Sequence, residues 1–384
     1  MFFLDLPPEL INVIFKFIDG DTRPDMRSLC RTCHLLRAEA TPLLYSKVYI
    51  PGHKGLFRFA KTMIRYPELA KLVVSFHGLF YPPAQDARPF KPLAKWMQHL
   101  VNLKVLHLII WHDVNQTPLP KCNFRLESLE ISGHSLAPNT HILEDQNDLV
   151  FLSSSVSGHT KGLPSHHACR NLKILRGSIY TARAFLPGRS IISLEWEYLL
   201  NEPLEVKDTL LREISEPLGR LRSLSYRSAL SIGPYHPIST LPTSYLHSLR
   251  FLEIQRLHPH DFASIATLAQ LRVLLILGPD KTSSILKEPY RILSLFSKCP
   301  LLQRVDVGSQ HHGFNKTCYR WVRGTEAAIV IPLHIAERGR IEYLNGEEGT
   351  EAKDIKLSAI LQDILTHTNP LSSRSWVGSA PEAR

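Results

Sequence analysis

The sequence lacks the features that would place it in a membrane or in a secreted disulfide framework. Its 384 residues contain no apolar run near the roughly 18–20 residues that a membrane-spanning helix needs. Six cysteines are spread along the chain, which is typical of reduced thiols in an intracellular protein. Asp5 and Glu9 interrupt the apolar N-terminus, which argues against a secretory signal. We therefore expect a soluble protein of the cytoplasm, the nucleus or both.

Motifs of catalysis are also absent. The sequence has no Gly-x-Ser-x-Gly elbow, P-loop, Gly-x-Gly-x-x-Gly or His-Glu-x-x-His. Two histidine pairs each have a cysteine nearby but no evident fourth metal ligand: His166-His167 with Cys169, and His311-His312 with Cys318. The sequence thus predicts no enzyme activity, no cofactor and no metal site.

A Cys-x-x-Cys-His pattern at Cys30, Cys33 and His34 matches the haem c attachment motif, which requires export. No second Cys-x-x-Cys exists to complete a zinc site. Both cysteines fall on the apolar face of an expected helix, where cysteine packs as a small hydrophobic residue.

The net charge of +10 is confined to residues 51–308, because the flanking segments 1–50 and 309–384 each hold equal numbers of basic and acidic residues. Nucleic acid is one possible partner for such a chain. The sequence has neither a dense basic run nor a nucleic-acid-binding motif, so nucleic acid is the less favoured partner.

Residues 1–50 predict three short helices. The first begins after Asp5 and carries an apolar face at helical spacing, namely Leu10, Val13, Ile14, Phe17 and Ile18. A second opens at Thr22-Arg23-Pro24 with Met26, Leu29, Cys30, Cys33 and Leu36 on its face, and a third short turn opens at Thr41-Pro42. Three short helices bury little area alone, so we expect them to pack on the following residues or on a partner.

This segment resembles an F-box. The matching residues are Leu6-Pro7-x-Glu9-Leu10, Ile14-Phe15, Phe17-Ile18, Leu29-Cys30-Arg31, Leu44-Tyr45 and Val48, while Cys33 stands where the family often has Trp. The resemblance implies docking on a Skp-type adaptor, and through it on a cullin. It also implies the docking residues, which would be Leu6, Pro7, Leu10, Ile14, Leu29 and Cys30. The alternative is a helical cap on a repeat array.

A Leu-x-x-Leu-x-Leu pattern, with apolar replacements, recurs nine times at steps of 19 to 46 residues. The copies begin at Leu69, Leu103, Leu126, Leu172, Ile191, Leu221, Leu249, Leu271 and Leu302. Leucine-rich repeats run about 20–29 residues each, so most steps fit one irregular repeat. The 46-residue step hides a degenerate repeat or an insertion, and its polar composition favours mainly a long loop. Segments 261–268 and 286–297 are expected to return as helices or extended chain.

We therefore predict an α/β fold: an N-terminal three-helix F-box followed by an irregular leucine-rich-repeat solenoid, with a parallel sheet on its concave side and helices outside. The boundaries are an F-box at 1–50, an array at 51–308 with loop insertions at 78–92 and 133–168, a C-terminal cap at 309–368 and a disordered tail at 369–384. In the cap, 309–327 lacks periodicity, 328–333 favours a strand, and 353–366 favours an amphipathic helix.

Because strand side chains alternate, the fifth residue of each motif should face the concave side. That row reads Ser75, His107, Glu130, Arg176, Glu195, Ser225, Glu253, Leu275 and Asp306, and the second position reads Lys104, Glu127, Lys173, Arg222, Arg250 and Arg272. As target-binding residues we expect the polar members from His107 to Asp306. A basic target segment against Glu195 and Glu253 is one hypothesis, and ordinary solvated surface charge is the other.

The family resemblance implies the substrate-recognition subunit of an SCF-type (Skp-cullin-F-box) ubiquitin ligase, a non-catalytic adaptor that recruits an unknown target protein. The residues leave two other functions open. One is a leucine-rich-repeat scaffold without a ligase role, and the other is nucleic-acid binding by the basic central region.

Overall fold

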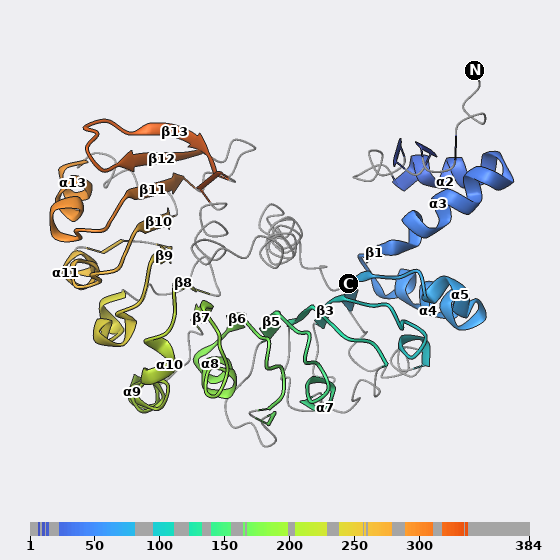
Figure 1. The fold of residues 1–384 in the computed structure, drawn as a ribbon, viewed down its shortest axis with the longest axis horizontal. Helices are drawn as coiled ribbons and strands as arrows, with labels where there is room; N and C mark the ends of the chain where they lie inside the picture. The colour runs from blue at the N-terminus through green and yellow to red at the C-terminus, as the bar shows by residue number, and fades with distance from the viewer. Residues whose placement is uncertain are drawn as a thin grey trace, which may run out of the picture. The chain divides into compact units, whose positions relative to one another are not determined.

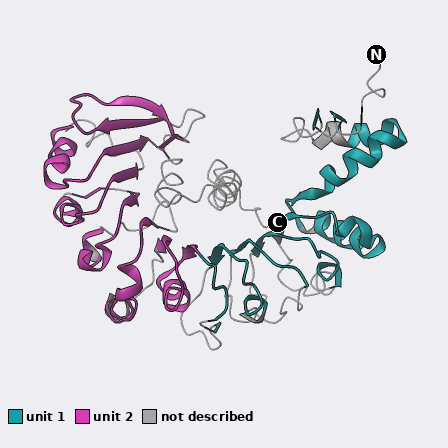
Figure 2. Cartoon of the chain, in the orientation of Figure 1, with its two compact units in different colours: residues 1–172 teal, residues 173–384 magenta. Residues whose placement is uncertain are grey.

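The computed structural model describes most of the chain between residues 23 and 336. The described residues are 7, 10–11, 13–14, 23–80, 95–110, 123–132, 140–154, 164–165, 167–198, 204–228, 238–255, 257–258, 260–278, 289–309, 317–333 and 335–336. The chain divides into two compact units, residues 1–172 and 173–384 (Figure 2). It is a mixed α/β protein whose strands β1 to β13 form a mostly parallel sheet ordered as in the chain. No helix among the described residues is long and apolar enough to cross a membrane.

Unit 1 opens with helices. Leu10, Ile11, Val13 and Ile14 are helical, and they are followed by α2 (Arg23–Thr32) and α3 (His34–Ser46). The expected second helix is interrupted at Cys33, whose extended backbone and thiol cap α3 by accepting a hydrogen bond from the Leu36 amide at 3.5 Å.

The prediction of a third, separate short turn opening at Thr41-Pro42 is wrong, because α3 continues through Pro42. Proline removes one main-chain hydrogen bond. Burial of Leu36 and Ala40 on the same helix offsets that loss.

Five parallel strands follow in unit 1: β1 (Lys47–Ile50), β2 (Ser75–Phe80), β3 (Val105–Ile110), β4 (Ser128–Ser132) and β5 (Phe151–Ser154). Between them lie α4 (His53–Arg65), α5 (Pro67–Ala70) and α7 (Thr140–Leu143) (Figure 1). β1 pairs with β2 from Lys47 opposite Ser75, so residues 47–50, placed in the N-terminal module by sequence, begin the sheet.

Unit 2 continues with six parallel strands: β6 (Ile174–Gly177), β7 (Ser193–Tyr198), β8 (Ser223–Ser228), β9 (Phe251–Ile254), β10 (Val273–Gly278) and β11 (Arg304–Ser309). Its helical segments are α8 (Ile179–Phe185), α9 (Leu204–Glu213), α10 (Ser215–Leu218), η3 (Ile238–Thr240), η4 (Thr243–Leu246), α11 (Asp261–Ala266) and α13 (Pro289–Lys298). Of the two alternatives left open for 261–268 and 286–297, α11 and α13 show the helix.

The leucine pattern produces these strands because its first, fourth and sixth residues enter the core. Leu221, Leu224 and Tyr226 of one repeat are buried, as are Leu249, Leu252 and Ile254 of the next. The main-chain hydrogen bonds repeat as well. The carbonyl of the second motif residue accepts hydrogen bonds from two amides of the next repeat. The Arg222 carbonyl, for example, accepts from the Arg250 amide at 2.9 Å and from the Phe251 amide at 3.0 Å. No single repeat could bury these apolar side chains alone.

Segment 133–168, predicted to be mainly a long loop with a degenerate repeat as the alternative, contains regular elements among its described residues. The segment contains α7 and β5, and β5 pairs with β4 from Ser128 opposite Phe151. Gln146 ties this repeat to the preceding one, since its side chain accepts from the Leu126 amide at 2.6 Å and donates to the Phe124 carbonyl at 3.1 Å. The degenerate repeat considered from the sequence is therefore present.

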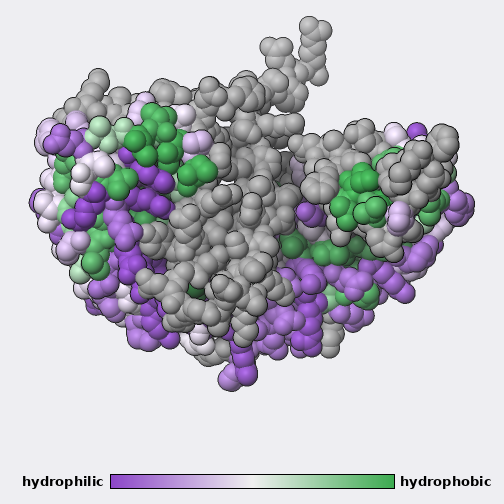
Figure 3. Space-filling view, turned by 45° about the horizontal axis from the view of Figure 1, so that its top comes forward, coloured by the Kyte–Doolittle hydropathy of each residue, from purple (hydrophilic) through white to green (hydrophobic). Residues whose placement is uncertain are grey.

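Two antiparallel strands follow the repeats in unit 2. β12 (Thr317–Val322) pairs with β11, and β13 (Ile329–Pro332) pairs with β12. The strand predicted at 328–333 is confirmed, whereas 309–327, read as lacking periodicity, contains β12. The last two strands expose Val322, Ile329 and Val330, and hydrophobic surface is visible in this part of unit 2 in Figure 3.

The predicted insertion at 78–92 begins inside β2, which continues to Phe80. Residues 81–94, the predicted helix at 353–366 and the tail at 369–384 lie outside the described residues.

Candidate functional site

The N-terminal helices enclose a small apolar core and leave other apolar side chains exposed. Ile11, Leu36 and Ala40 are buried, and Ile14, Leu29 and Cys30 pack against them together with Cys33, Leu43 and Leu44. Leu10 and Val13 are 50% and 46% exposed. Of the residues that the F-box resemblance implies for docking, Pro7 and Leu10 are therefore on the surface, three help to hold the helices together, and Leu6 lies outside the described residues.

The Cys-x-x-Cys-His residues take packing and capping positions. Cys30 is partly buried beside Thr41, Cys33 caps α3, and both thiols are free. Among the described residues, no group of three His, Cys, Asp or Glu side chains is arranged to hold a metal ion. His167 is described and exposed, while His166, His311 and His312 lie outside the described residues.

Residues at the third and fifth motif positions share one sheet face, and the register brings the predicted row together. His77, His107, Glu130 and Ser153 occupy matching positions on β2 to β5 of unit 1. Ser75 was expected to begin this row, but His77 does. The motif of this repeat starts at Val73 and not at Leu69, so Ser75 is its third residue and His77 is its fifth. We call the fifth-position residues the strand-face row.

In unit 1 the row forms a chain of polar contacts across three strands. Ser75 Oγ lies 3.1 Å from His77 Nε2, and His77 Nδ1 lies 3.2 Å from His107 Nδ1. His107 Nε2 lies 3.4 Å from the carboxylate of Glu130. Two ring nitrogens at such a distance share a proton, so one imidazole donates to the other. Three of the four residues in this series of contacts carry ionisable side chains, and Ser75 and His107 are buried.

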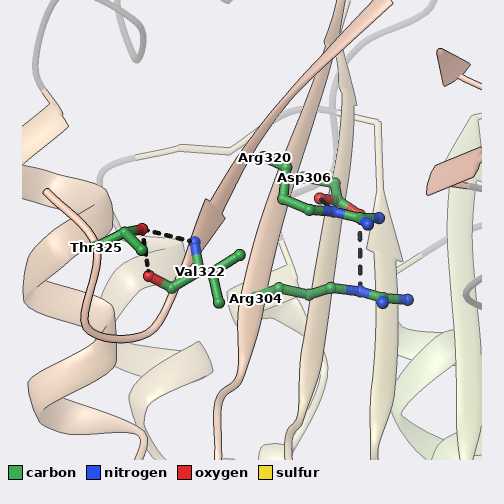
Figure 4. A network of polar contacts seen from close by, with 5 residues as sticks. All are labelled: Arg304, Asp306, Arg320, Val322 and Thr325. Atoms are coloured by element: carbon green, nitrogen blue, oxygen red, sulfur yellow. Dashed lines mark hydrogen bonds and ion pairs between the residues drawn. The ribbon is translucent and has the colours of Figure 1, made fainter. Parts of the chain in front are cut away.

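In unit 2 the charged members of the row find partners on neighbouring strands. Arg176 on β6 donates to the Glu195 carboxylate on β7 at 2.5 Å. Arg320 on β12 donates two hydrogen bonds of 2.7 Å to Asp306 on β11, and Arg304 Nε lies 3.9 Å from the same carboxylate (Figure 4). Arg176, Glu195 and Asp306 of the row thus pair within the chain.

The row is mostly covered. Five of its seven predicted target-binding members are buried, namely His107, Ser225, Glu195, Glu253 and Asp306, while Glu130 and Arg176 are partly exposed. The hypothesis of a basic target segment against Glu195 and Glu253 required open carboxylates. Glu195 is 5% exposed and Glu253 is 2% exposed.

Part of this cover is the chain's own C-terminal segment. Leu333 and Ala336 pack against Leu275 and Leu277 of β10, together with Cys318 of β12. Gly308 on β11 makes room for this contact, since a Cβ there would lie 2.9 Å from Leu277 Cδ2 and 3.2 Å from Cys318 Sγ. The strand face around β10 is therefore an interior surface of unit 2.

Sequence reasoning missed three contributors to this face: His77, Arg320 and Leu333. The repeat at His77 has Val73 and Gly78 where leucines stand elsewhere, which hid its register. Arg320 and Leu333 follow the repeats, so no motif position marks them. A signal for β12 was available, because Thr317, Tyr319, Trp321 and Val322 are residue types enriched in strands.

Comparisons with known proteins give distant structural likenesses but no sequence relative. No family model matches the chain, and no curated protein matches it. A solved LRR protein of Leptospira interrogans shares 16% identity and a TM-score of 0.24, over 68% of this chain and 61% of that one. The chain thus spans less than two thirds of that protein's length. Leucine-rich repeats are also what the leucine spacing of this chain predicts, and its repeat-like parallel sheet is consistent with them.

Proposed function

We propose that the chain is the substrate-recognition subunit of an SCF-type ubiquitin ligase. Its N-terminal helices would dock a Skp-type adaptor, and the repeats would hold a target protein. The chain itself would catalyse no covalent reaction. By fixing a target near the ubiquitin-charged enzyme, it would raise the effective concentration of a target lysine.

The observation that carries the proposal is the exposed apolar surface of the first helix. Ile11 faces the core of the N-terminal helices and is fully buried, whereas Leu10 and Val13 remain about half exposed. Apolar side chains exposed beside each other are typical of a protein-binding surface. Leu10 is also one of the residues that the F-box resemblance assigns to the adaptor.

The structure makes one of the obvious mutations uninformative. Ile14 packs against the helical core, so Ile14→Asp would unfold the helices as well as alter a docking surface. Leu10→Asp changes an exposed side chain. Phe57→Asp is a matched control, because Phe57 on α4 is also 50% exposed and lies outside the N-terminal helices.

The test is co-purification with a Skp-type adaptor. We expect wild type and Phe57→Asp to retain the adaptor and Leu10→Asp to lose it, with unchanged circular dichroism in all three. Loss in both variants, or retention in Leu10→Asp, would contradict docking through the first helix.

The second candidate is a repeat scaffold without a ligase role, in which the same helices cap the array. It is favoured by the direct run of α3 into β1, with the C-cap of α3 at Lys47, the first residue of the strand. A chain that binds no adaptor but loses stability when residues 1–46 are removed would support this scaffold.

A further inference from the structure

Helix α4 of unit 1 carries four cations on one face. Lys54, Arg58, Lys61 and Arg65 follow one another at steps of four, three and four residues, and all four are exposed. At 3.6 residues per turn, their directions around the helix axis fall within an arc of about 60°. The helix advances about 1.5 Å per residue, so the row is about 16 Å long. We call these residues the cationic face.

The opposite face of α4 fixes the helix on the sheet. Leu56, Ala60 and Met63 are buried there. Phe59 stacks on Phe76 of β2, with 5.7 Å between the ring centroids. The cationic face is therefore held by a packed support and points away from the core.

The cations of this face have no acidic partner within the part of the chain that the structure describes. α4 contains no acidic residue, and none of its four cations forms an ion pair with a described residue. Exposed cations elsewhere do so, since Lys104 pairs with Glu127 at 3.2 Å and Arg183 pairs with Glu213 at 2.7 Å. Like charges three or four residues apart destabilise a helix. A bound anion would remove this repulsion.

Two exposed aromatic rings border the cationic face. Phe57 lies one helical turn from both Lys54 and Lys61 and is half exposed. Tyr66 is the C-cap of α4 and is also exposed, and the Arg65 guanidinium lies 5.4 Å from the centre of its ring. Surfaces that bind single-stranded nucleic acid combine cations that follow the phosphate backbone with aromatic rings on which bases stack.

We propose that the cationic face of α4 binds the phosphate backbone of a single-stranded nucleic acid, while Phe57 and Tyr66 stack on its bases. An acidic protein segment would use the cations but not the rings. An anionic membrane takes up a helix through its apolar face, and that face of α4 is buried against the sheet. The net charge of +10 adds a long-range attraction for any polyanion.

This surface is separate from the residues assigned to adaptor docking, and it requires no ligase role. The sequence contains no dense basic run here, because two or three other residues separate each cation from the next. Only the helical turn brings the four together on one face.

The test is the binding of fluorescein-labelled oligo-dT to the full chain, followed by fluorescence anisotropy over a range of salt concentrations. The test variant is Arg58→Gln with Lys61→Gln. The matched control is Arg212→Gln with Lys298→Gln, which removes one exposed arginine and one exposed lysine from α9 and α13. We expect the test variant to bind roughly tenfold more weakly and the control to stay within about twofold of wild type.

The salt dependence gives a second readout of the same contacts. Each phosphate contact with a single strand contributes about 0.7 to the slope of log K against log salt concentration, so the slope of the test variant should be shallower by about 1.4. Phe57→Leu keeps an apolar side chain but removes the ring. It should weaken binding about fivefold through lost stacking and leave the slope unchanged.

Four results would overturn the proposal. They are no binding of oligo-dT by wild type, equal weakening in the test variant and the control, unchanged affinity in Phe57→Leu, and tighter α4-dependent binding of poly-L-glutamate or of phosphatidylserine vesicles than of oligo-dT. Circular dichroism checks that the variants are folded. If the test variant unfolds, Lys61→Gln takes its place with Lys298→Gln as control, and equal affinities of these two would overturn the proposal as well.

Discussion

Arg320 and Asp306 form a two-point ion pair between antiparallel strands, with both hydrogen bonds at 2.7 Å. The Asp306 side chain is fully buried and that of Arg320 is 14% exposed. The pair joins β12 to β11, the last strand of the parallel series. It therefore fastens the antiparallel end strands of unit 2 to the repeats.

Removing one partner of this pair should be strongly destabilising. Arg320→Ala leaves a buried carboxylate without its bidentate donor, and we expect a loss of about 3–5 kcal/mol in the free energy of unfolding. Urea denaturation measures it. The control is Arg220→Ala, which removes an exposed pair with Glu216 and should cost at most about 0.5 kcal/mol. Similar losses in both variants would contradict this role of Arg320.

Gly308→Ala should destabilise unit 2 through crowding. The added methyl group would lie 2.9 Å from Leu277 and 3.2 Å from Cys318, where β11 passes under Leu333. Overpacking of this kind costs about 1–3 kcal/mol. Thermal or urea unfolding should show this loss for Gly308→Ala. Gly52→Ser should leave stability unchanged or slightly raised, because no atom lies within 4 Å of a Cβ there and serine caps α4 better.

Gln146→Ala should lower the stability of the repeat that contains β5. The change leaves the buried Leu126 amide without its acceptor, which costs about 1–3 kcal/mol. Asn147→Ala alters the exposed neighbour and should be nearly neutral. Hydrogen exchange should also show faster exchange at Leu126 in Gln146→Ala. Equal stability of the two variants would mean that this contact does not hold the repeats together.

The stability of the chain should fall with rising pH partly through Cys299. Burial raises the pKa of the Cys299 thiol above its ordinary value of 9.0, although Arg323 and Lys298 nearby oppose the shift. The thiol donates to the Ile265 carbonyl at 3.5 Å, which also requires its proton. Because the pKa is higher in the folded state than in the unfolded state, the thiol contributes its full share to the free energy of unfolding at pH values below the unfolded-state pKa. This contribution is lost as the pH rises through the folded-state pKa.

Cys299→Ser keeps a donor but removes this titration. Unfolding free energies of both proteins, measured from about pH 8 to about pH 10, should show a shallower decline for the serine variant. Parallel declines would contradict the assignment to Cys299.

The sequence predicted the strands where its signal is local. Leucines at the first and fourth positions and an apolar residue at the sixth mark a strand that buries them, and β8, β9 and β10 follow this pattern. β5 was missed because Ser154 takes the sixth position, although Leu149 and Leu152 keep the first and fourth. The polar composition of the segment therefore favoured a loop, although two leucines of the motif were present.

The face of the strand row could be predicted, but its accessibility could not. Alternation along a strand is a local property. Burial of Leu275 depends on Leu333 and Ala336, which lie about sixty residues away along the chain. The partner of Asp306 likewise depends on the antiparallel register of β12, which no repeat position specifies. The motif therefore could not predict which distant residues bury the strand face or which distant residue pairs with Asp306.

The proposed docking of the N-terminal helices on a Skp-type adaptor is tested most directly by an equilibrium titration of the full chain with that adaptor bound to a cullin N-terminal segment. We expect a one-to-one complex with a dissociation constant of about 1 μM or tighter, weakened at least about tenfold by Leu10→Asp and unchanged by Phe57→Asp. No binding by the folded wild-type chain would contradict the claim.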